Sequence, residues 1–205
     1  MNNSVAKALY NSCTYLEFKN TVSNLLFEGK STGNKQSEDL LQYSVLTEIR
    51  LRRLDKTISV PEEVAAKLKE LKKKYVWLVI AEGWCGDAAQ ILPVLNKMAL
   101  ESDKIDLRIV LRDSNDELMS HFLTNGSRAI PKLIIVEKES GVVCDHWGPR
   151  PKGASDLIKD YKEEFSIVDQ EAKRRLQLWY LYDKGLSVQN EIVELLCSIV
   201  ECVCV

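Results

Sequence analysis

The middle of the chain alternates short apolar runs with amphipathic stretches. Residues 76–81 form an unbroken apolar run, and residues 105–111 alternate in polarity as a half-buried strand does. The expected elements are strands at 75–81, 105–111, 131–136 and 142–144, with helices after residue 85, at 115–123 and at 154–165. Gly141 splits the last two strands into an antiparallel hairpin. The order β-α-β-α-β-β-α predicts an α/β fold.

Apolar residues at helical spacing also mark both flanks of this segment. Helices are expected at 5–27, at 37–54, from Ser59 onward, at 169–183 and at 188–203. Ser59 and Glu62 have the spacing of a capping box at the start of the third helix. No linker rich in proline, glycine or serine separates the helices from the strands. We therefore expect one structural domain, in which residues 1–74 and 166–205 are helical extensions packed on a core of residues 75–165.

Two of the flanking helices carry patterns with more than one interpretation. In the second helix Leu41, Val45 and Ile49 lie on one apolar face, and the arginines within 50–53 either complement the helix dipole or form a binding patch. The last helix carries a continuous apolar stripe. This stripe either docks on the chain's own core or mediates a homodimer. Its members are Ile192, Leu195, Leu196, Ile199, Val200 and Val203.

A single thiol lies where the first strand is expected to turn into a helix, in the sequence Trp84-Cys85-Gly86-Asp87-Ala88. The free amide groups at a helix N-terminus favour the thiolate form of Cys85. The carboxylate of Asp87 opposes that effect because it is a second negative charge in the same turn. The sequence leaves the direction of the net pKa shift open. Cys85 is nevertheless the candidate for a reactive cysteine.

The turn and its surroundings resemble the thioredoxin superfamily. Pro93 lies eight residues after Cys85, residues 129–136 resemble a cis-proline turn that leads into a central strand, and Gly141 fits the following hairpin. Residues 147–151, with the Trp-Cys-Gly-Asp turn, resemble a bacterial branch of thioredoxin-family proteins that lacks the second, resolving cysteine. The resemblance implies a thioredoxin-like fold, with a central mixed sheet of about four strands flanked by helices and with extra N-terminal and C-terminal helices.

The resemblance also implies the roles of individual residues. Cys85 is the expected catalytic residue, and a cis peptide at Pro131 would place the backbone of Ile130 against it as a platform for an extended peptide. The expected substrate contacts are Trp84, Gly86, Asp87, Ile130 and Pro131. Trp84 is either an exposed lid beside the sulfur or a filler of the underside of the loop. Two departures weaken dithiol activity, because Ala88 replaces the resolving cysteine and Val79 stands where thioredoxin has a buried acid.

Three functions remain open on these residues. The first is monothiol exchange, in which Cys85 forms mixed disulfides with protein or peptide thiols. The thiol that resolves them is left open: a thiol of low molecular weight, a thiol of the substrate, or another cysteine of this chain. The second is a non-catalytic module that binds a peptide or a protein, so the chain is not assigned as an enzyme from sequence. The third is a glutaredoxin-like protein, which is disfavoured because the loops lack a glutathione-site glycine pair.

Composition narrows the partners and the compartment. Lys and Arg number 28 and Asp and Glu 30, for a net charge of −2, which gives no electrostatic case for nucleic acid or an anionic membrane. The first residues lack the pattern of a secretory signal, and the six cysteines are irregularly spaced. We therefore expect a cytoplasmic protein with free thiols. The two histidines show no metal-ligand spacing with Cys85, so no metal and no cofactor are expected.

Overall fold

The chain folds around a four-stranded mixed sheet, seen in a computed structural model that describes residues 3–202, the last three of them by their backbone alone. The strands are β1 (Tyr75–Ala81), β2 (Ile105–Leu111), β3 (Lys132–Glu137) and β4 (Val143–Trp147). They are arranged in the order β2-β1-β3-β4, in which β1 and β2 are parallel and the other two pairs are antiparallel. The prediction of an α/β thioredoxin-like sheet with a closing hairpin is confirmed.

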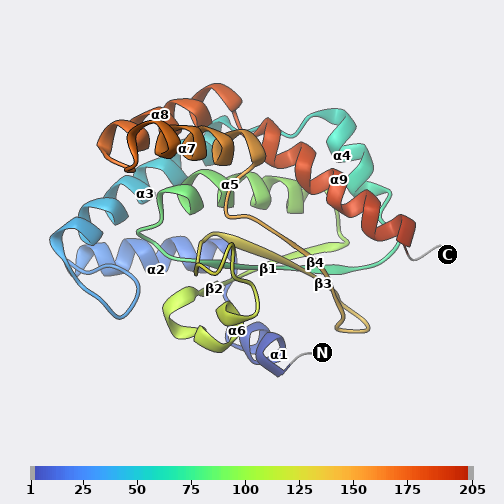
Figure 1. Cartoon of the computed structure of the whole chain (residues 1–205). Helices are drawn as coiled ribbons and strands as arrows, with labels where there is room; N and C mark the ends of the chain where they lie inside the picture. Colours follow the sequence, from blue (N-terminus) through green and yellow to red (C-terminus); the bar gives the residue numbers. More distant parts are fainter. Residues whose placement is uncertain (1–2, 203–205) are drawn as a thin grey trace.

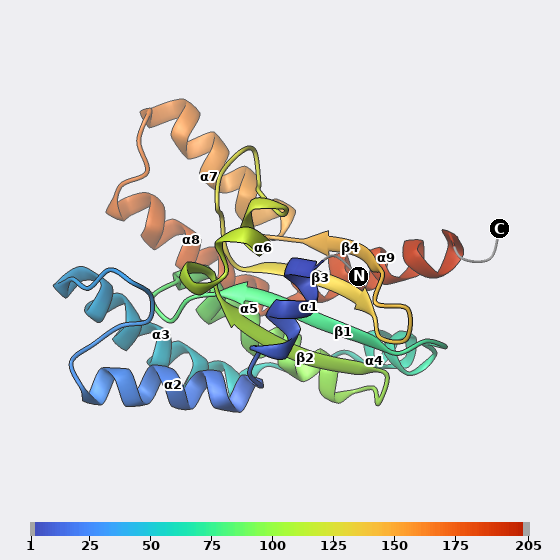
Figure 2. The ribbon, with the colours of Figure 1, turned by 90° about the horizontal axis from the view of Figure 1, so that it is seen from below.

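Helices cover both faces of this sheet. They are α1 (Asn3–Tyr10), α2 (Tyr15–Phe27), α3 (Glu38–Thr57), α4 (Glu62–Lys69), α5 (Gly86–Leu100), α6 (Asp116–Ser120), α7 (Lys152–Phe165), α8 (Gln170–Asp183) and α9 (Leu186–Cys202), with a 3-10 turn η1 (Arg112–Ser114). Helices α4, α5 and α9 lie over one face, and α1 and α6 lie over the other (Figure 1). Helices α3, α7 and α8 gather at the end of the sheet where β1 turns into α5 (Figures 1 and 2).

Strand β1 lies at the centre of the core. All seven of its residues are buried, because it pairs with a strand on each edge and has helices over both faces. This explains why its sequence is a continuous apolar run and not an alternating one. The chain leaves β1 at Ala81 and enters α5 at Gly86, so the position of the Cys85 turn is fixed by the most deeply buried strand of the sheet.

The expected single helix over residues 5–27 is wrong. The structure divides it into α1 and α2, and between them Cys13 exchanges two backbone hydrogen bonds with Ile109 of β2, at 2.9 and 2.8 Å. Thr14 begins α2 with a capping box, since its hydroxyl accepts the amide of Glu17 and the Glu17 carboxylate accepts the Thr14 amide. The Thr-x-x-Glu signal for this break is present in the sequence.

Replacing Thr14 by alanine is expected to lower the free energy of unfolding by about 1 kcal/mol, because the substitution removes the side-chain acceptor at the start of α2. Urea unfolding measures the loss. Thr21→Ala is the matched control, since it removes the same side chain from the interior of the same helix. An equal loss in both variants would rule out capping as the cause.

The predicted apolar face of the second helix is also wrong. Val45 and Ile49 of α3 are 43% and 57% exposed, whereas Ser44 and Thr47 are buried. The helix buries Ser44 because its hydroxyl is hydrogen-bonded to the hydroxyl of Ser31, at 2.7 Å, and to the carbonyl of its own preceding turn. Because its hydroxyl is satisfied, Ser44 can lie in the core without a large desolvation cost.

The capping box expected at Ser59 does not form. Helix α4 begins one residue after Pro61, which occupies the N-cap position and provides no side-chain acceptor. The carbonyl of Ser59 instead accepts a hydrogen bond from the side chain of Gln189 in α9. Ser59 therefore belongs to the contact between the N-terminal and C-terminal extensions.

The stripe on the last helix packs into the chain's own core. Ile192, Leu196 and Ile199 are 0%, 3% and 7% exposed and belong to one continuous cluster of buried residues that begins at Val5. The side chain of Val200 and all of Val203 lie outside the described residues. Homodimer formation stays a prediction, as does the division into extensions and core. Within residues 3–202 no helix has both the length and the apolar character needed to cross a membrane.

Candidate functional site

Cys85 lies at the start of α5, where the turn after β1 ends. It is the N-cap residue of that helix, and its sulfur accepts the amide of Ala88 at 3.4 Å. The thiol donates to the carbonyl of Ile130, also at 3.4 Å, and the Ile130–Pro131 peptide bond is cis. The structure therefore brings Cys85, Ile130 and Pro131 together at the C-terminal end of β1.

The thiol of Cys85 is buried and protonated. The residue is 7% exposed, and burial, followed by the carboxylate of Asp87, raises the pKa of Cys85 to about 12. The amides of the helix N-terminus and the guanidinium of Arg150 act in the opposite direction but do not compensate. At pH 7 a group with this pKa is a thiolate in roughly 10⁻⁵ of molecules. The effect of the helix N-terminus, which favours a thiolate, is therefore smaller than the combined effect of burial and Asp87 on the pKa of Cys85.

Asp87 is held by two partners from the C-terminal side of the chain. One carboxylate oxygen accepts from Nε and Nη2 of Arg150, at 2.8 and 2.7 Å, and the other accepts from the hydroxyl of Tyr180 at 2.9 Å. Burial, with the carboxylate of Asp87 next to it, raises the pKa of Tyr180 well above its ordinary value. Asp87 is only 8% exposed, so its carboxylate is directed into the chain. Helix α8 is thereby fastened to the first turn of α5.

Trp84 and Gly86, the neighbours of Cys85, are both partly buried. The guanidinium of Arg112 stacks over the Trp84 ring, 4.7 Å from the ring centre, and Trp84 also packs against the core. Trp84 is therefore intermediate between the exposed lid and the buried filler considered from the sequence. Gly86 faces α3 and α8, since a Cβ at this position would meet Arg50 and Gln177.

The sequence interpretation missed a buried acid beside the turn. Glu82 is fully buried, and its carboxylate accepts from the hydroxyl of Thr32 and from the amide of Asp113. Burial raises the pKa of Glu82. Val79, the position at which the resemblance led us to expect an acid, is buried in β1 three residues before Glu82. A charged residue directly after an apolar run was the available signal, and the network it forms attaches the loop before α3 to the Cys85 turn.

A buried lysine, Lys132, directly follows the cis-proline turn and connects it to the turn at Gly148. Lys132 is 3% exposed, and its ammonium donates to the hydroxyl of Thr124 at 2.6 Å and to the carbonyl of Gly148 at 2.9 Å. Burial lowers the pKa of Lys132. The Gly148–Pro149 bond is also cis, so Lys132 joins the two proline turns beside Cys85.

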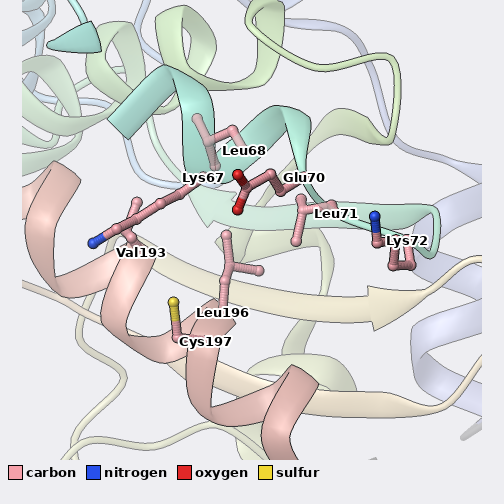
Figure 3. A pocket seen from close by; sticks show the side chains of 8 residues that line it. All are labelled: Lys67, Leu68, Glu70, Leu71, Lys72, Val193, Leu196 and Cys197. Atoms are coloured by element: carbon pink, nitrogen blue, oxygen red, sulfur yellow. The ribbon is translucent and has the colours of Figure 1, made fainter. Parts of the chain in front are cut away.

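The other described cysteines are free thiols away from this turn. Cys13 lies at the bridge to β2, Cys144 lies in β4, and Cys197 lies in α9. Cys197 lines a pocket of about 450 Å³ between α4 and α9, whose lining contains none of the residues at the Cys85 turn (Figure 3). The side chain of Cys202 and all of Cys204 lie outside the described residues. Among the described side chains, no group of three or more metal-ligating residues occurs.

The comparisons with known proteins agree with this geometry. A family model described as thioredoxin matches residues 33–162. The crystal structure of a protein of unknown function from Pseudomonas aeruginosa aligns with a TM-score of 0.62 and 15% identity over 94% of this chain and 96% of that one. The crystal structure of an HIV epitope scaffold aligns with a TM-score of 0.53 and 15% identity over 91% of this chain and 99% of that one. No curated protein matches significantly. The chain belongs to the thioredoxin family.

Proposed function

We propose that this protein exchanges disulfides through one cysteine, Cys85, and that an outside thiol completes each cycle. The observation that supports this proposal is the position of the Cys85 sulfur, between the first turn of α5 and the carbonyl of Ile130 at the cis-proline turn. An extended peptide at that turn would lie beside the sulfur. Ala88, in place of a second cysteine, makes an external resolving thiol necessary.

The chemistry needs only sulfur exchange. Cys85 loses its proton to solvent and attacks one sulfur of a disulfide, so that the Cys85–substrate S–S bond forms while the substrate S–S bond breaks. The departing thiolate takes up a proton, and an external thiol later attacks the mixed disulfide and returns Cys85 to its reduced state. No net oxidation of the protein remains after the cycle. A cytoplasmic pool of small thiols, in the bacterial setting that the Trp-Cys-Gly-Asp turn resembles, would supply the resolving group.

The carbonyl of Ile130 has a second use in this scheme. It accepts the Cys85 thiol in the resting protein, and the same carbonyl is the acceptor that a peptide strand would need. A peptide N–H that bonds to the Ile130 carbonyl would therefore lie next to the Cys85 thiol, on the second lone pair of the same oxygen.

The alternative is a thioredoxin-fold module that binds a peptide or protein without chemistry. The observation that favours it is the burial of Cys85, together with a pKa raised to about 12 by that burial and by Asp87. A thiol in this state reacts slowly, because the thiolate is the nucleophile. In this function the cysteine is a structural N-cap of α5.

The pH dependence of Cys85 alkylation tests the state of the thiol. With iodoacetamide, and with peptide mass spectrometry to follow each cysteine, the rate at Cys85 should rise about tenfold per pH unit from pH 7 to pH 10 without a plateau, since its pKa is about 12. A plateau near pH 8 would contradict the raised pKa.

Trapping distinguishes the two functions. The wild-type protein, incubated with a peptide disulfide at pH 8, should carry the peptide on Cys85 and should release it when a small thiol is added. Cys144→Ser is the matched control and should still carry the adduct. If no adduct forms and Cys85→Ser keeps all cellular partners of the wild type, the binding module is the correct function.

A further inference from the structure

Helix α3 carries apolar side chains on two opposite faces. Leu51 and Leu54 are buried in the core of the chain. On the opposite side of the helix, Val45, Leu46 and Ile49 are 43%, 42% and 57% exposed. Helices α2 and α8 lie on either side of α3 (Figures 1 and 2) and leave these three side chains open to solvent. A helix that packs on its own chain needs one apolar face, so a second one marks an interaction surface.

Charged residues extend this outer face to both ends of α3. Glu38 is the first residue of the helix, whereas Arg53 and Lys56 lie near its end, and all three are exposed. Their side chains form no hydrogen bond or ion pair with the part of the chain that the structure describes. The outer face of α3 thus has an acidic end, an apolar centre and a basic end. Its residues are Glu38, Val45, Leu46, Ile49, Arg53 and Lys56.

The outer face of α3 is symmetric in its spacing about Thr47. Val45 and Ile49 lie two residues on either side of Thr47, and Glu38 and Lys56 lie nine residues on either side. The distance from Glu38 to Lys56 corresponds to about five turns of an α-helix, so the two side chains lie on one line along α3. Acid at one end and base at the other make this line complementary to itself when it is reversed.

We propose that two copies of this protein associate through the outer faces of their α3 helices, which pack antiparallel around a two-fold axis at the level of Thr47. Around such an axis, residues at equal distances on either side of it meet. Val45 of each copy then contacts Ile49 of the other, and Glu38 pairs with Lys56. Arg53 comes opposite Leu41 of the other copy and meets no like charge.

The pattern favours a second copy over a partner of another kind. A partner with charge of one sign would meet a like charge at one end of the outer face, which costs affinity. The stripe on α9 does not compete for this role, because Ile192, Leu196 and Ile199 are buried in the chain's own core. The association extends the description of the protein beyond the chemistry of Cys85 and does not depend on that chemistry.

Sedimentation velocity tests the association. A contact of one helix pair is at the small end of specific interfaces, so the mean mass should rise from one chain towards two between about 1 and about 300 µM. Ile49→Glu places a carboxylate at the centre of the contact and should keep the protein monomeric throughout. Val142→Glu is the matched control, since Val142 is β-branched and 54% exposed but lies between β3 and β4. It should associate as the wild type does.

Three results would overturn the proposal. The wild type could stay monomeric at every concentration, in which case the outer face of α3 binds another molecule or none. Ile49→Glu could associate as the wild type does, in which case another face mediates the contact. Val142→Glu could be as monomeric as Ile49→Glu, in which case an added carboxylate opposes association wherever it is placed.

Charge reversal tests the antiparallel register. Glu38→Lys brings two lysines together in each pair and Lys56→Glu brings two glutamates together, so each variant should weaken association by about tenfold. The double variant has two attractive pairs again and should associate as the wild type does. If the double variant associates no better than the single ones, the register is wrong and the proposal fails.

The same variants exclude the helix dipole as the explanation. Both reversals oppose the dipole of α3, so the double variant should have the lowest free energy of unfolding of the set. Urea unfolding at a concentration where the variants are monomeric measures this order. The proposal expects the least stable variant to recover association, which an effect on the helix alone would not produce.

Discussion

Replacing Asp87 by asparagine is expected to increase the rate of Cys85 alkylation at pH 8 by at least about tenfold. The carboxylate is the second cause, after burial, of the raised pKa of Cys85, and a like charge in the same turn typically shifts a pKa by one unit or more. The substitution also frees Arg150, whose charge then favours the thiolate. A lower thiol pKa gives a proportionally larger thiolate fraction at a fixed pH below it.

Two further variants distinguish the loss of the Asp87 charge from the detachment of α8 as the cause of faster alkylation. Tyr180→Phe removes the other hydrogen bond to Asp87 without changing any charge, so it should alter the rate much less than Asp87→Asn. Asp103→Asn removes a carboxylate whose side chain is 84% exposed and should have no effect. If Tyr180→Phe accelerates alkylation as much as Asp87→Asn, detachment of α8 explains the result, and the electrostatic account is wrong.

Replacing Gly148 by alanine is expected to lower the free energy of unfolding by roughly 3 kcal/mol or more. A Cβ at this residue would lie 2.4 Å from the carbonyl oxygen of Pro131, and the φ of Gly148 is +110°, which side chains rarely adopt. The backbone must move to relieve the contact, and the hydrogen bond from Lys132 to the Gly148 carbonyl moves with it. Urea unfolding followed by circular dichroism measures the loss.

Gly126→Ala is the matched control for this substitution. Gly126 also has a positive φ, of +75°, but a Cβ there would have no heavy atom within 4 Å. Its loss should be about 1 kcal/mol, the cost of the left-handed backbone alone. Similar losses in the two variants would show that the contact with Pro131 contributes little.

The strands and most helices could be predicted because their signals are local. The buried run of β1, the alternation of β2 and the hairpin at Gly141 each depend on a few neighbouring residues, and all of them agree with the sheet observed. The errors arose where tertiary contacts decide the outcome. Ser44 is buried in place of Val45 because Ser31 satisfies its hydroxyl. The spacing of apolar residues along a helix cannot reveal such a contact between two hydroxyl groups.

Only the part of the site that lies close to Cys85 in the sequence was predicted. Cys85 and its neighbours follow from one short motif, but the state of the thiol depends on Arg150 and on Tyr180, which lies 93 residues from its partner Asp87. The direction of the pKa shift remained open in the sequence because burial is the largest contribution to it. Helix α8 contacts Asp87 and Gln90 of the same helix that Cys85 caps, and no pattern near Cys85 specifies the docking of α8.

The hydrogen bond between α8 and Asp87 affects the choice of a fragment for the study of Cys85. A fragment limited to residues 75–165 keeps Cys85 and both proline turns but loses Tyr180, Gln177 and Arg50. Asp87 and Gly86, next to Cys85, would then lack the contacts that they have in the full chain. Reactivity measured on such a fragment would describe a generic thioredoxin turn. The helices that contact Asp87 and Gly86 therefore lie outside a boundary drawn around the core.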